Sequence, residues 1–420
     1  MLTIAYVFFA FHLLASASPS PVDRKSEGVA IGLTKRQDSV VNGFADLDAL
    51  IQSVLRVRSK YENTIEAYRR NTGQEPPISL GTIFDMDSPS NSSSSRRATG
   101  AEPLTDQNEV LWQGQISVGT PPVTYIVDFD TGSSDLFLPG SSCTSNCAGH
   151  KLYDPTLSTA SADRHKKFSL AYGDGSSVSG EQYTDTVTVA GLPATKQALG
   201  AANTYSDGFA KSNFPPDGLL GMGFQTISQF NAPPFMQTLI AQKQTTKPVF
   251  AFQLTPNAPE LFLGGTNTNL YTGPITYVSV TTQGYWQVTM DSVLIGKTTA
   301  VTSTKAIIDT GTTLIIGDAS KVQRFYSRIP KYQYIGNGFY SIPCNAIPTV
   351  SLTFGGKSFA IPPSVFNLGQ VSAGSPNCVG AIVSSGTTSD FWIIGDSFLT
   401  TVYSIFDIGG SRVGFAALKS

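Results

Sequence analysis

Short runs of alternating apolar and polar residues cover most of the chain, and Gly and Pro separate them. Two apolar runs, residues 125–132 and 306–311, each end in the tripeptide Asp-Thr-Gly. Such a run followed by a Gly turn predicts a buried β-strand and a tight turn. The content of 39 Gly and 25 Pro, with only 14% charged residues, agrees with many short strands. The pattern therefore predicts an all-β fold.

The two Asp-Thr-Gly turns belong to two diverged copies of one unit. Each is followed, at a similar distance, by two apolar residues and a Gly, at 219–221 and 393–395. Two like units commonly pack about an approximate two-fold axis, which brings equivalent residues face to face. Asp130 and Asp309 are therefore predicted to meet. A single Asp-Thr-Gly is also typical of an ordinary hairpin turn, so this prediction depends on the repetition.

The beginning of the chain has a different pattern. Residues 2–15 are apolar and lead into small residues at 15–17. This stretch is too short to span a bilayer and predicts a secretory signal peptide over residues 1–17. No later run has spanning length and the C-terminus is polar, so we expect no membrane anchor.

Residues 18–97 are predicted to be a propeptide. Apolar residues at three- and four-residue spacing predict a helix over 47–70. A Ser-rich linker at 88–95 contains the only N-glycosylation sequon and ends in the dibasic pair Arg96-Arg97. We expect activation by cleavage there; a dibasic pair that arose by chance is the alternative.

Seven segments in one order make the chain resemble the pepsin-like aspartic endopeptidases of family A1, and most of all their secreted fungal members. The segments are 114–122, 130–136, 172–176, 217–221, 284–288, 309–314 and 391–396. The resemblance implies a bilobal fold with two related β lobes, 98–273 and 274–420, and a central cleft. A substrate would lie across that cleft as an extended strand.

The resemblance implies that Asp130 and Asp309 are the catalytic dyad, with a water held between them. Two such close carboxylates share a proton and titrate as a coupled pair, the known behaviour of aspartic-protease dyads. The ionised member would act as general base on the water, and the protonated member would hydrogen-bond the scissile carbonyl. The implied activity is peptide hydrolysis at acidic pH, without an acyl-enzyme.

The resemblance also gives supporting roles to neighbours of the two aspartates. Ser133 and Thr312 resemble hydroxyls that bond the outer carboxylate oxygens, while Thr131 and Thr310 resemble a pair that bonds across the lobe junction. The alternative is that these hydroxyls satisfy local backbone groups. The whole set of dyad-support residues is Thr131, Gly132, Ser133, Thr310, Gly311 and Thr312.

Residues 168–189 alternate about a Gly-Asp-Gly turn and predict a long β-hairpin. It resembles the family's flap, with Tyr172, Gly173 and Asp174 as the substrate-binding tip. Many relatives carry an indole donor for the flap Tyr where this chain has Phe137, so Tyr172 must find another partner. Asp174 is expected to accept a substrate lysine; a role in shaping the turn is the alternative.

Lys60-Tyr61, in the predicted helix, resembles a Lys-Tyr pair that relatives place over the dyad. An ammonium between two carboxylates is favoured while they are ionised and loses its partners when acid protonates them. The propeptide is therefore expected to inhibit the enzyme and to leave in acid. A surface lysine on a helix is the alternative.

Three other groups of polar residues are predicted to have no catalytic or metal-binding role. Asp128 lies on the same strand face as Asp130 and is interpreted as a solvated or locally hydrogen-bonded carboxylate. His150 and His165 lie in a polar stretch and are expected at the surface, which leaves little support for a Ser-His-Asp hydrolase. The cysteines lack zinc-type spacing, so no metal and no cofactor is expected.

Four cysteines allow three pairings. The resemblance implies disulfides within the lobes, Cys143–Cys147 and Cys344–Cys378. Free buried thiols are the alternative, although an oxidising compartment favours bridges.

The composition limits the partners. With 28 Lys and Arg against 30 Asp and Glu, a net charge of −2 argues against a nucleic-acid partner. We expect a monomer that acts on protein or peptide substrates and is secreted or sent to an acidic vacuole. A catalytically silent binding protein would have lost an Asp-Thr-Gly or Tyr172, and a glycosidase with paired carboxylates would not explain the repeat.

Overall fold

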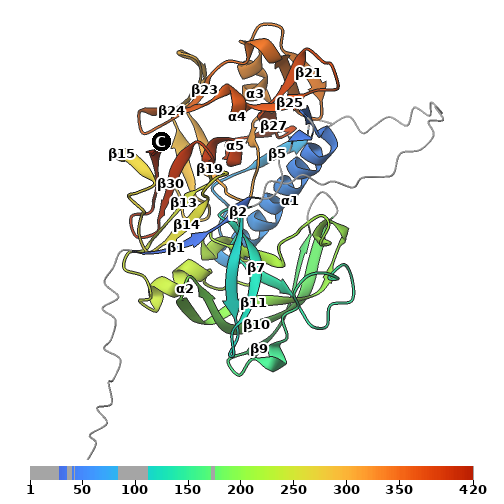
Figure 1. Cartoon of the computed structure of the whole chain (residues 1–420), viewed down its shortest axis with the longest axis vertical. Coiled ribbons are helices and arrows are strands. Elements are labelled where there is room, and N and C mark those ends of the chain that lie inside the picture. Colours follow the sequence, from blue (N-terminus) through green and yellow to red (C-terminus); the bar gives the residue numbers. More distant parts are fainter. Residues whose placement is uncertain (1–27, 36–39, 42, 84–111, 172–175, 420) are drawn as a thin grey trace, which may run out of the picture.

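The computed structural model describes residues 28–35, 40–41, 43–83, 112–171 and 176–419. The predicted signal peptide, the linker with Arg96-Arg97, and the hairpin tip with Tyr172, Gly173 and Asp174 lie outside these ranges. Within them, two β-rich lobes pack side by side and one long helix, α1 (Leu47–Thr72), crosses between them (Figure 1). The all-β prediction is confirmed for both lobes.

One twisted eight-stranded sheet organises the first lobe. Its order is β2-β6-β7-β12-β8-β11-β10-β9, and β10 also pairs with β6. The strands are β2 (Thr34–Lys35), β6 (Trp112–Val118), β7 (Val123–Asp130), β8 (Leu136–Pro139), β9 (Ala162–Ala171), β10 (Ser177–Val189), β11 (Leu192–Tyr205) and β12 (Gly218–Gly221). The short helix α2 (Phe235–Ala241) packs against β11. The predicted hairpin is confirmed, because β9 and β10 pair antiparallel with Ala171 opposite Ser177.

Three sheets build the second lobe, in the orders β16-β19-β29-β20-β27, β18-β17-β23-β24 and β21-β22-β26-β25-β4-β3. The strands of the first two are β16 (Gln287–Met290), β17 (Ser292–Ile295), β18 (Thr298–Val301), β19 (Thr304–Ile308), β20 (Ile315–Gly317), β23 (Val350–Phe354), β24 (Lys357–Ile361), β27 (Ile382–Ser384) and β29 (Phe391–Ile394). Those of the third are β3 (Val40–Val41), β4 (Phe44–Ala45), β21 (Gln333–Gly336), β22 (Phe339–Pro343), β25 (Asn367–Gln370) and β26 (Asn377–Gly380). The helices of the second lobe are α3 (Ala319–Tyr326), α4 (Pro363–Phe366) and α5 (Asp396–Leu399).

A six-stranded sheet, β1-β14-β13-β30-β31-β15, joins the lobes. It contains β1 (Val29–Gly32), β13 (Val249–Gln253), β14 (Glu260–Leu263), β15 (Tyr271–Ser279), β30 (Val402–Asp407) and β31 (Arg412–Leu418). Phe250 and Phe406 stack at 4.9 Å between ring centroids, and Trp286 packs edge-on against both. Aromatic packing of this kind stabilises the junction. The predicted lobe boundary after residue 273 falls within β15.

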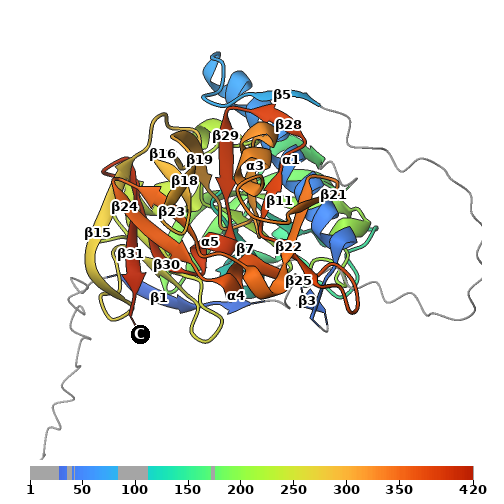
Figure 2. The same cartoon turned by 90° about the horizontal axis from the view of Figure 1, so that it is seen from above.

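The helix predicted over 47–70 is confirmed as α1 (Leu47–Thr72). The Asp46 side chain accepts a hydrogen bond from the Ala49 amide at the N-terminus, and Gly73 ends the helix in the left-handed conformation, with φ of 67°. Its apolar stripe is buried: Leu50, Val54, Val57 and Tyr61. Figure 2 shows α1 at one side of the molecule, between β3 and β5 (Leu80–Ile83).

Short strands on both sides of α1 pair with strands of the lobes; those before the helix join larger sheets, and the strand after it forms a separate two-stranded sheet. β1 pairs with β14, β2 with β6, β4 with β25, and β5 (Leu80–Ile83) with β28 (Thr387–Ser389). The sequence pattern did not predict these strands, because segments of two to four residues are too short to show a period. The N-terminal segment, by which we mean the described residues from 28 to 83, is therefore attached to both lobes at several places.

Both predicted disulfides are present. Cys143 and Cys147 have Cα atoms 6.2 Å apart, and Cys344 and Cys378 have Cα atoms 5.0 Å apart. Of the helices in the described ranges, none is both long enough and apolar enough to cross a membrane.

Candidate active site

The two Asp-Thr-Gly turns have the same local construction. In the first lobe, β12 lies parallel to β7 with Gly221 opposite Asp130. In the second, β29 lies parallel to β19, and the Asp309 amide donates to the Ile394 carbonyl at 3.1 Å. Each aspartate therefore stands at the end of a strand held by the apolar-apolar-Gly element identified in the sequence.

The turns bring the two carboxyl groups together in a buried site, as their exposed fractions of 1% for Asp130 and 0% for Asp309 indicate. The Gly132 amide donates to Asp130 Oδ1 at 2.9 Å, and the Gly311 amide donates to Asp309 Oδ1 at 3.0 Å. A Cβ on Gly132 would lie 2.6 Å from Asp309 Oδ1, and one on Gly311 would lie 2.3 Å from Asp130 Oδ1. Only glycine fits either position, because each turn contacts the carboxylate of the other lobe.

Thr131 and Thr310 join the lobes by reciprocal hydrogen bonds. The Thr131 amide donates to Thr310 Oγ1 at 3.1 Å, and the Thr310 amide donates to Thr131 Oγ1 at 3.0 Å. The hydroxyls donate in turn to carbonyls of the opposite lobe, Thr131 to Ile308 at 2.9 Å and Thr310 to Phe129 at 2.7 Å. These bonds fix the relative position of the two aspartates.

The two hydroxyls expected at the outer carboxylate oxygens differ. Thr312 Oγ1 donates to Asp309 Oδ2 at 2.7 Å. Ser133 Oγ and Asp130 Oδ2 are both buried, and neither makes a hydrogen bond with any other described residue. Ser133 lies close enough to Asp130 to lower the pKa of that carboxyl. Of the two hydroxyls, only that of Thr312 makes a formed hydrogen bond to its aspartate.

Lys60 of α1 lies between the two carboxyl groups. Its Nζ is 3.0 Å from Asp130 Oδ1, and 3.1 and 2.8 Å from Asp309 Oδ1 and Oδ2. The Tyr61 hydroxyl donates to Asp309 Oδ2 at 3.0 Å, and its ring packs against Tyr285 and Phe391. The alternative of a surface lysine is wrong, because Lys60 is only 7% exposed.

The charges in this cluster shift one another. Burial tends to lower the pKa of Lys60, but the two carboxylates outweigh burial and raise it above its usual range. Burial, helped by the charge of Asp309, raises the pKa of Asp130 against the opposing effect of Lys60. Burial also acts to raise the pKa of Asp309, but Lys60 and the bonds from Asp130, Lys60 and Thr312 bring it below its usual value. Negative charge is therefore more stable on Asp309 than on Asp130 in this state.

An apolar pocket lies beside Asp130. The first lobe lines it with Asp128, Phe209, Phe214 and Leu219, and α1 covers it with Ser53, Arg56, Val57 and Lys60. Asp128 was expected to be either solvated or locally hydrogen-bonded, and the first of these is wrong, since that residue is 2% exposed. The helix covers this end of β7, which the strand's alternation alone could not reveal.

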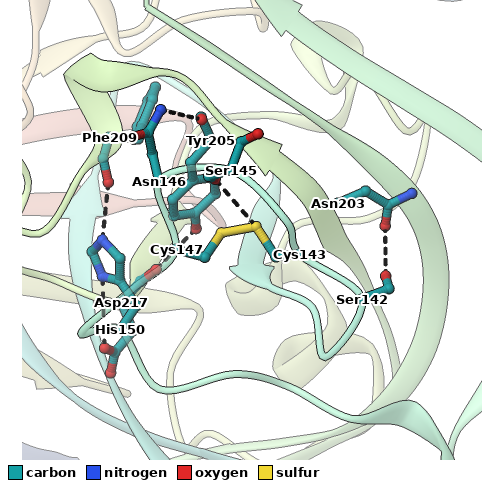
Figure 3. The surroundings of a disulfide bond; sticks show 10 residues. All are labelled: Ser142, Cys143, Ser145, Asn146, Cys147, His150, Asn203, Tyr205, Phe209 and Asp217. Carbon is teal, nitrogen blue, oxygen red and sulfur yellow. Dashed lines mark hydrogen bonds and ion pairs between the residues drawn. A yellow bond between two sulfur atoms is a disulfide. The ribbon is translucent and has the colours of Figure 1, made fainter.

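His150 is the second correction. It was expected at the surface, but its side chain is buried beneath the disulfide loop (Figure 3). Its Nε2 donates to the Phe209 carbonyl at 2.9 Å, and its Nδ1 lies 3.9 Å from Asp217 Oδ1. Polar neighbours in the sequence concealed this burial, because the ring's partners come from distant segments. Burial lowers the pKa of His150. His165 is exposed, as predicted.

Helix α1 also contacts the β9–β10 hairpin and the loop that follows β12. Asn63 Nδ2 donates to the Ala171 carbonyl at the end of β9, and Asn71 Nδ2 donates to the Ser228 carbonyl at 2.8 Å.

Phe137 is buried, with edge-on contacts to Tyr205 and Phe209. Within the described ranges, no cluster of three or more His, Cys, Asp or Glu is arranged to hold a metal ion.

Comparison with known proteins agrees with this geometry. A family model described as eukaryotic aspartyl protease matches residues 112–418. The chain belongs to this family. Among the relatives of this aspartyl protease, an aspartic protease of Phaffia rhodozyma is 46% identical over 332 residues, which are 77% of this chain and 80% of the relative. Cathepsin E-B of Xenopus laevis is 33% identical over 379 residues, which are 87% and 94% of the two chains.

A third relative, major aspartyl peptidase 1 of Cryptococcus neoformans, is 32% identical over 354 residues, covering 77% of this chain and 72% of the relative. Family membership confirms the predicted pepsin-like fold and aspartic-type endopeptidase activity, with proteins or peptides as the substrate class. Two contacts in this aspartyl protease had no signal in the sequence. Lys305 and Asp390 hold the segment that follows α1, and they come together only through the parallel pairing of β19 and β29.

Proposed function

We propose that Asp130 and Asp309 are the catalytic dyad of a secreted endopeptidase that is made as a zymogen and acts in acid. The observation that carries this proposal is the single ammonium of Lys60, 3.0 Å from Asp130 and 2.8 Å from Asp309. A cation seated between two buried carboxyl groups marks the position that a polarised water would occupy after the helix has left.

The asymmetry of the pair suggests how the proton is used. The Thr312 hydroxyl stabilises negative charge on Asp309, so we assign Asp309 as the general base and Asp130 as the protonated partner. Asp309 takes a proton from the water as its oxygen bonds to the scissile carbonyl carbon, and Asp130 gives its proton to the carbonyl oxygen. Asp309 then gives its proton to the nitrogen as the C–N bond of the gem-diol breaks, and Asp130 takes a hydroxyl proton of the gem-diol, which leaves a carboxylic acid, an amine and the original protonation of the pair. The two turns supply the rigidity that this geometry needs.

Residues 18–97 act in this proposal as an intramolecular inhibitor. Helix α1 occupies the cleft, with Lys60 and Tyr61 on the dyad. Because docking lowers the pKa of Asp309, it contributes stability above the ordinary carboxyl range, and that contribution is lost as the pH falls through the lowered value. Acid therefore releases the helix, and cleavage near Arg97 completes activation.

The remaining assignments come from the sequence. Residues 1–17 would direct export, or delivery to an acidic vacuole, and both disulfides suit an oxidising compartment. The mature monomer would consist of lobes 98–273 and 274–420. The apolar pocket beside Asp130 favours large apolar side chains next to the scissile bond, and Asp174 would additionally accept lysine.

The test is an acid-pH digest of a peptide library with mass-spectrometric mapping of the cuts. We expect cleavage at acidic pH by wild type and its suppression by a transition-state-mimicking inhibitor of aspartic proteases. Asp130→Asn and Asp309→Asn serve as inactive controls. Cleavage that persists in both folded variants would exclude the dyad assignment.

A further inference from the structure

A half-exposed ion pair on the second lobe holds the segment that follows α1. Lys305 lies on β19 and Asp390 immediately precedes β29, and their side chains form a hydrogen-bonded ion pair with 42% and 43% of each exposed. Lys305 Nζ also donates to the Pro77 carbonyl at 3.0 Å, and Asp390 Oδ1 accepts from the Ser79 amide at 3.1 Å. An ion pair this exposed contributes little to stability, so its value to the fold does not explain it.

The recognition involves backbone groups only. One donor and one acceptor of the pair bind a carbonyl and an amide two residues apart, which is the spacing of successive groups on one edge of an extended strand. Ile78, between them, is 3% exposed. The next residues continue as β5, antiparallel to β28 with Leu80 opposite Ser389. This arrangement accepts an extended peptide with little regard to its sequence, apart from one apolar side chain.

The pair lies within reach of a substrate in the cleft. Lys305 precedes Asp309 on the same strand by four residues, and a strand rises by about 3.3 Å per residue, so the separation is roughly 13 Å. An extended peptide bridges that distance with about four residues. A peptide chain at the dyad would therefore arrive at the pair about four residues from its scissile bond.

We propose that Lys305 and Asp390 form a subsite for the backbone of an extended peptide, which residues 77–79 occupy here and the substrate occupies after that segment has left. The inference rests on the proposed function, since it assumes that the N-terminal segment is removed. Only a peptide that extends about four residues beyond its scissile bond would reach this subsite. Binding there would therefore depend on the length of the substrate and not on the side chains at its scissile bond.

The electrostatics suit an acidic enzyme. Burial acts to raise the pKa of Asp390, but the hydrogen bonds from Lys305 and the Ser79 amide bring it below its usual value. While a backbone amide is bound to it, the carboxylate therefore keeps its charge to a lower pH than an ordinary carboxyl group does.

The first test compares short and long peptides with the acid-activated enzyme. The short peptide has about three residues on each side of the cut, and two longer ones add about four residues on either the N- or the C-terminal side. The double variant Lys305→Met/Asp390→Ala removes both groups without leaving a lone charge. We expect it to cleave the short peptide like wild type and to lose about tenfold in kcat/KM, through KM, on one longer peptide.

A matched control is Lys321→Met. Lys321 Nζ donates to Thr304 Oγ1 at 2.8 Å, next to Lys305, so this variant removes a neighbouring lysine and should leave all three peptides unchanged. Equal activity of the double variant and wild type on both long peptides would overturn the proposal, as would an equal loss on short and long peptides.

A second measurement does not depend on activity. A fluorescent peptide with the sequence of residues 74–83 is titrated into Asp130→Asn enzyme, with and without the double substitution, after an added protease has cut at Arg96-Arg97 and the released segment has been washed away in acid. We expect about tenfold weaker binding with the double substitution, and equal affinities would overturn the subsite. If wild type cleaves no peptide but this difference is found, the proposed function fails and the subsite stands.

Discussion

The two aspartate turns are alike in backbone and different in surroundings. Both carry an aspartate at a strand end, an amide bond from the Gly two residues later, and a Thr that bonds across the lobes. Asp309 Oδ2 additionally receives the hydroxyls of Thr312 and Tyr61. Asp130 Oδ2 has no hydrogen-bond partner within the described residues. The pKa of Asp309 is lowered while that of Asp130 is raised.

The repeated turns place the two carboxyl groups side by side, whereas the residues around each turn determine which carboxyl group holds negative charge more readily. An approximate two-fold axis alone would make the two carboxyl groups equivalent, and neither would be preferred as acid or base. The extra donors on one side break the equivalence and stabilise charge there. Negative charge is therefore more stable on the Asp309 side than on the Asp130 side when Lys60 is present.

The largest effect is expected from removing either carboxylate. Asp130→Asn and Asp309→Asn should each reduce peptidase activity to less than about a few per cent while the fold persists, because neither half of a shared-proton pair acts alone. The measurement is kcat/KM on a cleaved peptide, with circular dichroism as the control for folding. Substantial activity in either folded variant would remove that residue from the dyad.

The next effect concerns latency. Lys60→Met removes the cation between the carboxylates, so the docked helix should no longer lower the pKa of Asp309 and its release should begin at higher pH. In wild type, the lowered pKa of Asp309 stabilises the docked helix at pH values above the ordinary carboxyl range. The variant lacks this stabilisation, so its helix leaves at a higher pH. Proenzyme conversion measured against pH should shift toward neutral.

Lys247→Met, which changes a lysine outside the cluster, serves as the control for this shift. A Lys60→Met proenzyme that converts on the wild-type acid profile would show that the ammonium does not control latency.

The meeting of Asp130 and Asp309 and the helix α1 were predictable from sequence, because each has a repeating signal. Asp130 and Asp309 stand in a repeated motif, and α1 shows a clear three- and four-residue period. The burial of His150 was not predictable, because its partners Phe209 and Asp217 come from distant segments. The contact between Lys305 and Asp390 depends on the register of β19 with β29, which no local pattern encodes.

A smaller effect is expected at the lobe junction. Thr310→Val removes the acceptor for the Thr131 amide and the donor to the Phe129 carbonyl, leaving two buried backbone groups without partners. The free energy of unfolding should fall by about 1–3 kcal/mol, and activity should fall as the carboxyl groups lose their alignment. Thr310→Ser keeps the hydroxyl and is the matched control. If the valine and serine variants melt and cleave alike, the cross-lobe bonds do not hold the dyad.

The smallest effect separates the two turns most directly. Thr312→Val removes a formed, charge-assisted bond to Asp309, whereas Ser133→Ala removes a hydroxyl that makes no bond in this state. We expect kcat/KM to fall by about tenfold in the first variant and by less than about threefold in the second. The acidic limb of the activity profile should move to higher pH only in Thr312→Val, because a carboxylate that loses a donor protonates more readily. Equal losses and equal shifts would mean that the Ser133 hydroxyl turns onto Asp130 once Lys60 has left, so that the asymmetry belongs to the proenzyme alone. The unequal result would instead assign Asp309 as the base in the free enzyme, because the donor that distinguishes it stays in place after the helix departs.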